Sequence, residues 1–268
     1  MSCCDEKDLL VIIPAYNEEK NISTVLDALE NMHVTDYADT LVINDSSSDN
    51  TNYIVRERKF ALVTHVFNLG YGSALQLGYK YAVRRGYRYV IQMDADGQHD
   101  VCNIKTIYDA LKTPDSDGHY PDIVLGSRYL PGSSPFKVSA VKKFAYSLFS
   151  FMIWCGTGRK IKDPTTGLQG LNYRTFLSYS RYNRFDDKYP DANIILHMLL
   201  CGYRIVEIPA VMHQRQFGKS MHSGLKPVMY MFRMTYSILA VLLRDKVLGE
   251  EKRAGEEDNL NASGYAEH

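Results

Sequence analysis

The chain has 268 residues, of which 45% are hydrophobic and 23% charged, and these values are typical of a folded globular protein. Lys and Arg together number 31, as do Asp and Glu, so the formal net charge is zero. This balance argues against a nucleic-acid partner, because general nucleic-acid binders carry a basic excess or stripe.

Short apolar runs alternate with helical patterns through the first half of the chain. The runs predicted to be strands are LLVIIP (9–14), TLVIN (40–44), ALVTHVF (61–67), YRYVIQM (87–93) and DIVLGS (122–127). Helices are predicted near 22–32, 50–58, 73–85 and 101–112. This rhythm predicts an α/β fold, a mostly parallel sheet with helices on both faces. In such sheets, ligands bind outside the carboxyl ends of the strands.

The rhythm changes in the second half. Helices are predicted over 137–155, in DANIILHMLLCG and over 225–244, with a strand in RIVEIPAV. The last stretch is polar and rich in small residues, which is typical of a disordered tail. We therefore expect an α/β domain at 1–222, an amphipathic helix for a membrane surface or an interface at 223–248, and a disordered tail at 249–268.

The sequence DADGQH follows an apolar strand pattern. Alternate residues of a strand face the same side, so Asp94 and Asp96 can reach a shared ligand. Paired carboxylates suit Mg²⁺ or Mn²⁺, which commonly take their remaining oxygens from water and substrate phosphates. The competing interpretation is a solvated turn, in which Asp and Gly are ordinary residues.

The ends of the first two predicted strands carry groups suited to a nucleotide. In PAYNEE, the ring of Tyr16 lies beside Asn17 and Glu18, a set that can stack on a base and bond to it. Asp45 in NDSSSD is an acceptor for a base or ribose. No G-x-G-x-x-G follows the first strand, which argues against a dinucleotide oxidoreductase. A capped strand-to-helix turn explains the asparagines equally well.

Cationic side chains complete the same edge. Arg128 in GSRY and Arg215 with Lys219 in RQFGKS could bind phosphate oxygens and neutralise a leaving diphosphate. Each of these residues alone is more often a solvated surface charge.

In order, the motifs PAYNEE, NDSSSD, NLGYGSA, DADGQH, GSRY, DPTTGLQG and RQFGKS make the chain resemble the family 2 glycosyltransferases of the GT-A fold. The resemblance covers about residues 8–222 and is strongest to the dolichol-phosphate mannose synthase and polyprenyl-phosphate glycosyltransferase branch. It implies an inverting, Mg²⁺- or Mn²⁺-dependent transfer of a sugar from a nucleoside-diphosphate sugar, such as GDP-mannose or a UDP-hexose, to a polyprenyl phosphate.

The resemblance also implies roles for individual residues. Nucleotide contacts would come from Pro14, Tyr16, Glu18, Ile43, Asp45, Asp94 and Ala95. Asp96 and Gln98, with Asp94, would hold the metal, and Arg128, Arg215 and Lys219 would bind phosphates. Acceptor contacts would come from Lys143, Ser147 and Ser220. The chain departs from many relatives at Asn44, where they have Asp, and at Tyr71, where they have a basic residue.

Two other functions remain open. One is transfer to a saccharide hydroxyl in cell-surface polysaccharide synthesis, with Asp163 or Asp191 as the base. In the alternative, purely structural interpretation, Asp163 belongs to an Asp-Pro turn and Asp191 caps a helix. The other function, from a different class, is a non-catalytic nucleotide-sugar-binding protein.

The predicted location is cytoplasmic, peripheral on the cytosolic face of a membrane. The amino terminus has acids where a signal peptide has basic residues, and the five cysteines form no C-x-x-C pair. The helices predicted at 137–155 and 225–244 each combine an apolar stripe with basic residues, which suits a lipid surface. Burial in the core or in a homo-oligomer would explain the same stripes.

Overall fold

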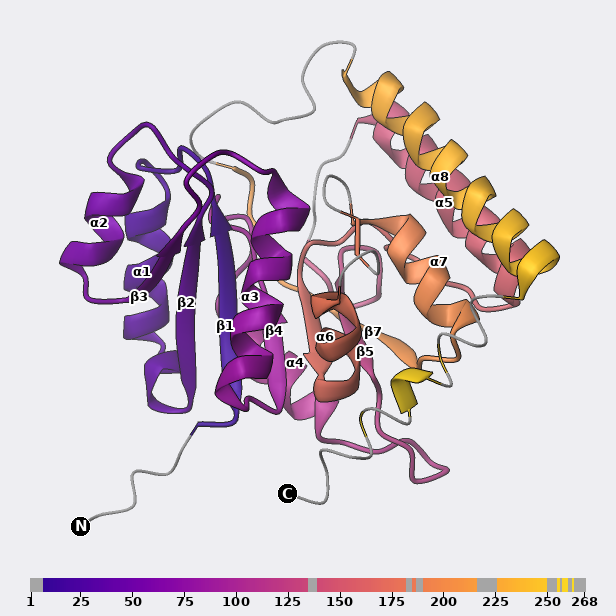
Figure 1. Ribbon diagram of the computed structural model, residues 1–268, viewed down its shortest axis with the longest axis horizontal. Coiled ribbons are helices and arrows are strands. Elements are labelled where there is room, and N and C mark those ends of the chain that lie inside the picture. Colours follow the sequence, from indigo (N-terminus) through magenta and orange to yellow (C-terminus); the bar gives the residue numbers. More distant parts are fainter. Residues whose placement is uncertain are drawn as a thin grey trace.

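The structure is a computed structural model that describes residues 7–134, 139–181, 185–186, 190–215, 226–249, 255, 257–259 and 262. A seven-stranded sheet runs through the centre of this part of the chain (Figure 1). Its strands are β1 (Leu9–Ala15), β2 (Ala38–Asn44), β3 (Ala61–Thr64), β4 (Tyr89–Gln92), β5 (Ile123–Ser127), β6 (Gln169–Asn172) and β7 (Ile205–Pro209). The strand order is β3-β2-β1-β4-β6-β5-β7, and only β6 runs antiparallel to its neighbours. The predicted α/β fold with a mostly parallel sheet is confirmed.

Helices cover both faces of the sheet, as predicted. Their bounds are α1 (Ile22–Asn31), α2 (Thr51–Glu57), α3 (Tyr71–Arg85), α4 (Cys102–Leu111), α5 (Ala140–Thr157), α6 (Tyr173–Ser180), α7 (Ala192–Leu200) and α8 (Lys226–Leu248). Helices α1, α2 and α4 pack on one face of the sheet, whereas α3, α6 and α7 pack on the other (Figure 1). Strand β1 separates these two cores because its side chains alternate. Leu10 and Ile12 belong to the α3 side, and Leu9, Val11 and Ile13 belong to the α1 side.

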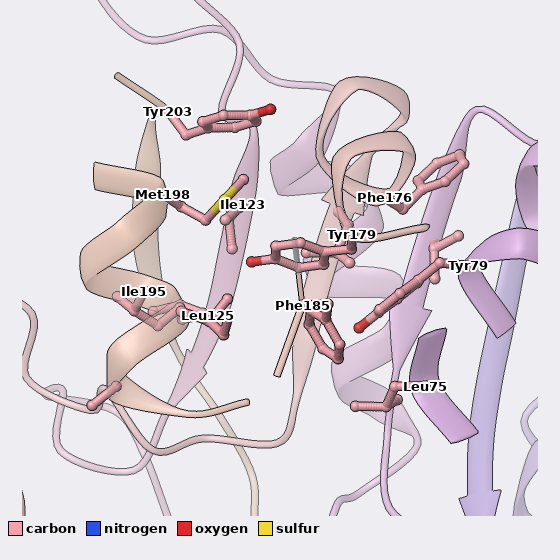
Figure 2. Close-up of a cluster of buried hydrophobic side chains, with 14 of the residues drawn as sticks. Leu75, Tyr79, Ile123, Leu125, Phe176, Tyr179, Phe185, Ile195, Met198 and Tyr203 are labelled. Carbon is pink, nitrogen blue, oxygen red and sulfur yellow. The ribbon is translucent and has the colours of Figure 1, made fainter. Parts of the chain in front are cut away.

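An aromatic cluster joins the two halves of the chain. Tyr79 of α3 contacts Tyr179 and Phe185, with ring centroids 5.4 Å and 5.3 Å away. Figure 2 shows these rings between α3 on one side and Ile195 and Met198 of α7 on the other. Burial of these large aromatic side chains fixes how the second half of the chain packs against the first half.

The sequence pattern did not predict β6 or α6. Strand β6 has the sequence QGLN, which lacks a run of β-branched residues. A Cβ at its Gly170 would lie 2.2 Å from a methyl carbon of Ile107, so glycine permits α4 to approach this strand closely. The insertion of an antiparallel β6 between β4 and β5 leaves those two strands parallel to each other.

Helices α5 and α8 lie side by side beyond α7, away from the sheet (Figure 1). The inner face of α8 is buried at Met234 and Ile238, which are at most 1% exposed. Its outer face is apolar and exposed, as described below. Among the described residues, no helix is both long enough and apolar enough to cross a membrane.

One residue of the expected tail, Asp258, has partners in the folded part of the chain. Its side chain accepts hydrogen bonds from Ser178 and Tyr203, both at 2.8 Å, and pairs with Arg181 at 3.1 Å. Asp258 is only 2% exposed. The polar composition of the tail predicted disorder. At Asp258, however, hydrogen bonds from Ser178 and Tyr203 and the charge of Arg181 offset the cost of burying the carboxylate.

Candidate active site

The carboxyl ends of β1, β2, β4 and β5 lie at one edge of the sheet, because these strands are all parallel. The polar residues that follow them are Tyr16, Asp45, Asp94 and Arg128. The fold therefore gathers the predicted motifs where an α/β sheet binds its ligands.

Tyr16 and Glu18 follow β1. The Tyr16 ring is 50% exposed at the open edge, so a base can reach it. Asn17 adopts a left-handed conformation with φ 55°, and its backbone N–H donates to the Ser47 hydroxyl at 2.9 Å. Its side-chain oxygen accepts from the Ser48 N–H at 2.8 Å. These bonds tie the loop after β1 to the loop after β2.

Other predicted nucleotide contacts lie deeper. Pro14 and Ile43 are paired across β1 and β2 and are buried, and Ala95 is 3% exposed. Only the backbones of these residues are placed to face a ligand at the strand ends.

Asp45, which was expected to contact a base or ribose, is buried and bonded to the protein. It is 3% exposed, and its carboxylate accepts from the N–H groups of Leu69 at 2.9 Å and Gly70 at 2.8 Å. The Nδ1 atom of His65 lies 2.7 Å from the same carboxylate. Asp45 therefore anchors the glycine turn that begins α3.

Asp94 and Asp96 both follow β4, and Asp96 lies in the turn after it, near enough to Asp94 to be affected by its charge. The Asp94 carboxylate accepts from the Tyr71 hydroxyl at 2.9 Å, and Asp96 accepts from the Gln98 N–H at 3.0 Å. Burial raises the pKa of both carboxyl groups, and the charge of Asp94 raises that of Asp96 further. Gly97 makes the turn with φ 74°. Two hard oxygen ligands that repel each other fit a divalent cation, with Gln98 close by.

Within the described residues, no three His, Cys, Asp or Glu side chains converge as a closed metal cage. A cation here would therefore complete its shell with water and substrate phosphates, as Mg²⁺ commonly does.

His99, which sequence reasoning left without a role, supports the backbone at this turn. Its Nδ1 accepts from the Asp94 N–H at 3.0 Å, and its backbone pairs with Met212 in an isolated antiparallel bridge. Burial lowers the pKa of His99 to about 4, so the ring is neutral and can accept this bond at neutral pH. His99 is a structural residue of the Asp94 turn.

Arg128 is held by Asp163 in a two-point ion pair. Its Nε and Nη2 atoms lie 2.7 Å and 2.6 Å from the two Asp163 oxygens, and its backbone N–H donates to the same carboxylate at 2.9 Å. Asp163 is 0% exposed. Both Asp163 oxygens are bonded to Arg128, which favours a structural role for Asp163 over the expected role as a base. The pair forms over 35 residues of sequence, which no local pattern reveals.

Arg215 lies next to the acids Glu18 and Asp96. Its Nη2 donates to a Glu18 oxygen at 2.5 Å, and its Nη1 lies 3.6 Å from Asp96. Glu18, Asp96 and Arg215 are thus brought together from three loops. Lys219 and Ser220 lie outside the described residues.

Asp191 precedes α7 but does not cap it with its side chain. Instead, it accepts from the Tyr230 hydroxyl of α8 at 2.6 Å. Burial raises the pKa of Asp191 to about 6, and the nearby charge of Asp94 adds to this effect. Asp191 is therefore a carboxylate of the site itself, mostly ionised at neutral pH.

A cavity of ≈ 840 Å³ adjoins Arg128. The Arg128 guanidinium lies over the rings of Tyr146 and Tyr129, at 5.2 Å and 5.6 Å from their centroids, and both rings line the cavity. The remaining lining residues are Lys143, Ser147, Ser150, Phe151, Trp154, Lys160 and Lys162. The predicted acceptor residues Lys143 and Ser147 thus border an aromatic and basic space.

An apolar surface extends along α5 and α8 from this cavity. We call it the α5/α8 face; its exposed members are Val141, Phe144, Phe151, Trp154, Met229, Phe232, Tyr236, Leu239, Leu243 and Val247. Phe232 and Tyr236 are 69% and 76% exposed. Exposed large apolar side chains gathered along two packed helices are typical of interaction sites.

The sequence model described as "Glycosyl transferase family 2" matches residues 10–178, which include the strand ends after β1, β2, β4 and β5. Polyprenol monophosphomannose synthase from Mycolicibacterium smegmatis is 28% identical, over 80% of this chain and 81% of its own length. Undecaprenyl-phosphate mannosyltransferase from Micrococcus luteus is 26% identical, over 81% of this chain and 88% of its own length.

Among solved structures, glucosyl-3-phosphoglycerate synthase from Mycobacterium tuberculosis, in complex with Mn²⁺ and UDP-glucose, is similar with a TM-score of 0.62. The sequences are 17% identical, and the match covers 88% of this chain and 79% of that one. At this identity the likeness concerns the fold, and it confirms the expected GT-A architecture.

Proposed function

We propose, from the premise that this chain belongs to glycosyl transferase family 2, that it moves a sugar from a nucleoside-diphosphate sugar to a polyprenyl phosphate. Its activity as a glycosyltransferase follows from the family and from relatives named as mannosyltransferases. The donor, the acceptor, the cation and the inverting course are our proposal.

The donor would lie across the strand ends. Its base would stack on exposed Tyr16, and its diphosphate would face Asp94 and Asp96. Mg²⁺ or Mn²⁺, held by these two carboxylates with Gln98, would offset charge growing on the leaving diphosphate. Arg215 is within reach of the same phosphates, because it already contacts Asp96 and Glu18.

The cavity beside Arg128 is the observation that supports a phosphate acceptor. Tyr146 and Tyr129 form its wall and also stack on Arg128, so an anion in the cavity would lie close to a fixed guanidinium. Lys143, Lys160 and Lys162 add positive charge at its border, and Phe151 and Trp154 offer an apolar path toward the α5/α8 face. A phosphate attached to a long hydrocarbon chain has both properties.

In the transfer, an acceptor phosphate oxygen attacks the anomeric carbon of the sugar. The bond from this carbon to the nucleoside diphosphate breaks on the opposite side, which inverts the configuration. The acceptor phosphate is ionised near neutral pH, so no side chain must remove a proton from it. Arg128 and Arg215 stabilise the diphosphate that departs with the bonding electrons.

The α5/α8 face would rest on the membrane that holds the acceptor. Phe144, Phe232 and Tyr236 would enter the interfacial region of the lipid, and basic residues near the same helices would meet lipid phosphates. The protein would then bind peripherally to a cytosolic membrane surface.

The test is a comparison of acceptors. Labelled UDP-sugars and GDP-mannose are incubated with the protein and Mn²⁺, in the presence of polyprenyl phosphate in detergent or of soluble saccharides. We expect label to enter the organic phase only with polyprenyl phosphate. Transfer to saccharides alone would contradict the proposal, and donor binding without turnover for every acceptor would favour a non-catalytic binding protein.

Asp191 supports the second candidate, transfer to a saccharide hydroxyl. A hydroxyl acceptor requires a base, and Asp191 has a pKa near 6 within the site. Its bond from Tyr230 leaves lone pairs of the carboxylate available. We rank this candidate second because an uncharged, soluble sugar requires neither the lysines nor the apolar path of the cavity.

A further inference from the structure

The Asp94 carboxylate is enclosed on two sides by residues outside the acidic motif. On one side, the Tyr71 hydroxyl donates to Oδ1 at 2.9 Å. On the other side lies Gly167, where an added Cβ would be 2.8 Å from Oδ2 and 3.2 Å from Oδ1. No side chain larger than hydrogen fits at position 167 without displacing the carboxylate. Tyr71 and Gly167 thus both contact the Asp94 carboxylate and limit where it can lie.

The scaffold behind each of these residues is itself fixed. Gly70, with φ 98°, precedes Tyr71, and its N–H donates to buried Asp45. The Gly167 carbonyl accepts a hydrogen bond from the side chain of Gln92 at 3.1 Å, and Gln92 is the last residue of β4. Asp45 therefore determines where α3 begins, and through that start it determines where the Tyr71 hydroxyl lies.

Tyr71 can serve only as a donor in this bond. The carboxylate oxygen accepts, so the hydroxyl supplies the proton and the bond is charge-assisted.

We propose that Tyr71 is a positioning residue, which with Gly167 presets the Asp94 carboxylate for the cation and diphosphate of the donor. The inference rests on the proposed function, because it assigns a task to the donor site. Partners that orient a metal-binding side chain without touching the metal typically change metal affinity by about 10- to 100-fold when removed.

The matched control is Tyr87→Phe. Tyr87 lies just beyond α3 and donates its hydroxyl to Asp39 at 2.7 Å, which is the same kind of bond at the opposite end of the helix. Tyr71→Phe and Tyr87→Phe each remove one phenol-to-carboxylate bond. Gly167→Ala tests the other wall independently, because it adds one methyl group against Asp94.

The experiment measures Mn²⁺ affinity by electron paramagnetic resonance, with UDP or GDP present, alongside the melting temperature and steady-state kinetics. We expect Tyr71→Phe and Gly167→Ala to weaken Mn²⁺ binding roughly tenfold or more, with activity recovering at high Mn²⁺. Tyr87→Phe should bind Mn²⁺ as the wild type does. Unchanged affinity in Tyr71→Phe, or an equal loss in Tyr87→Phe, would overturn the positioning role.

The same titration separates this inference from the proposed function. Wild-type protein that binds Mn²⁺ but forms no lipid-linked sugar would contradict the proposed acceptor, and a selective Mn²⁺ defect in Tyr71→Phe would still support the positioning role. Wild-type protein that binds no Mn²⁺ would overturn both the cation site and the task assigned to Tyr71.

Discussion

Arg128 and Asp163 form a two-point ion pair in which Asp163 is 0% exposed and both of its oxygens lie within 2.7 Å of the guanidinium. The pair joins the loop after β5 to the DPTTG segment. It directs the guanidinium between the acids of the donor site and the aromatic wall of the cavity. Asp163 thus contributes to the site by holding Arg128.

Asp163→Ala should reduce the free energy of unfolding by roughly 3–5 kcal/mol, because it leaves Arg128 unpaired in a buried position. The control is Asp27→Ala, which removes a partner of Arg58 from a half-exposed ion pair and should change stability by about 0–1 kcal/mol. Urea denaturation measures both values. Equal, small effects in the two variants would contradict a structural role for the buried pair.

Asp191→Asn distinguishes the two acceptor classes. Asn can still accept the bond from Tyr230, so the site geometry is retained, but the base is lost. With polyprenyl phosphate we expect kcat to change by less than about tenfold, whereas loss of a general base for a hydroxyl acceptor reduces rates by about 10²- to 10⁴-fold. Steady-state kinetics with both acceptors decide between them. A 10²-fold or larger fall in the kcat of Asp191→Asn with polyprenyl phosphate would favour Asp191 as a base.

Asp191 also predicts a pH dependence of stability. Its folded-state pKa of about 6 exceeds the usual value of 3.8, so the folded protein holds this proton over a range where the unfolded chain has lost it. Stability therefore falls as pH rises through this window and stays lower above it. Asp191→Asn should remove that fall and stabilise the protein at pH 7.5 by on the order of 1–3 kcal/mol.

The measurement is the difference in unfolding free energy between wild type and Asp191→Asn at pH 4.5 and at pH 7.5. The groups around position 191 are the same in both proteins, namely Tyr230, Asp94, Arg128 and Asp186. The difference in unfolding free energy therefore reports the Asp191 carboxyl group. A difference that is the same at both pH values would contradict the prediction.

The α5/α8 face should bind lipid through its exposed rings. Replacing Trp154 and Phe232 by Ser removes two side chains that are 51% and 69% exposed. At about 1.5–3 kcal/mol per fully buried aromatic side chain, the loss should weaken binding at least tenfold. Flotation with anionic vesicles measures it. Tyr53→Ser on α2, where the ring is 64% exposed, is the control.

Flotation that is equal in the double variant and in the wild type would contradict membrane docking by this face. Sedimentation of the same proteins without vesicles tests the alternative, since a homo-oligomer built on the face would dissociate in the double variant.

The sequence predicted the donor edge because its information is local. Asp94 and Asp96 follow the end of β4, and parallel strands bring Tyr16 and Arg128 to the same edge. These expectations required only the positions of the strand ends and the general location of ligands at the carboxyl ends of parallel strands. The helices and strands of the first half follow the predicted order for the same reason.

Partnerships between distant segments could not be predicted. The pairing of Arg128 with Asp163, the inward turn of Asp45 and the bond from Tyr230 to Asp191 each depend on how separate loops meet. Strand β6 was not predicted because its sequence, QGLN, has low strand propensity. Its glycine is there because α4 packs closely against it. The tail composition likewise gave no sign that Asp258 has buried partners.

The central claim is that Asp94 and Asp96 hold a cation for sugar transfer to a polyprenyl phosphate. Mass spectrometry of the lipid fraction, after incubation with Mn²⁺, nucleotide sugar and polyprenyl phosphate, tests it most directly. We predict that wild type yields polyprenyl phosphate carrying one added sugar, and that Asp96→Ala yields none while its melting temperature is retained. Normal product formation by Asp96→Ala, or a wild type that glycosylates only soluble saccharides, would contradict the account.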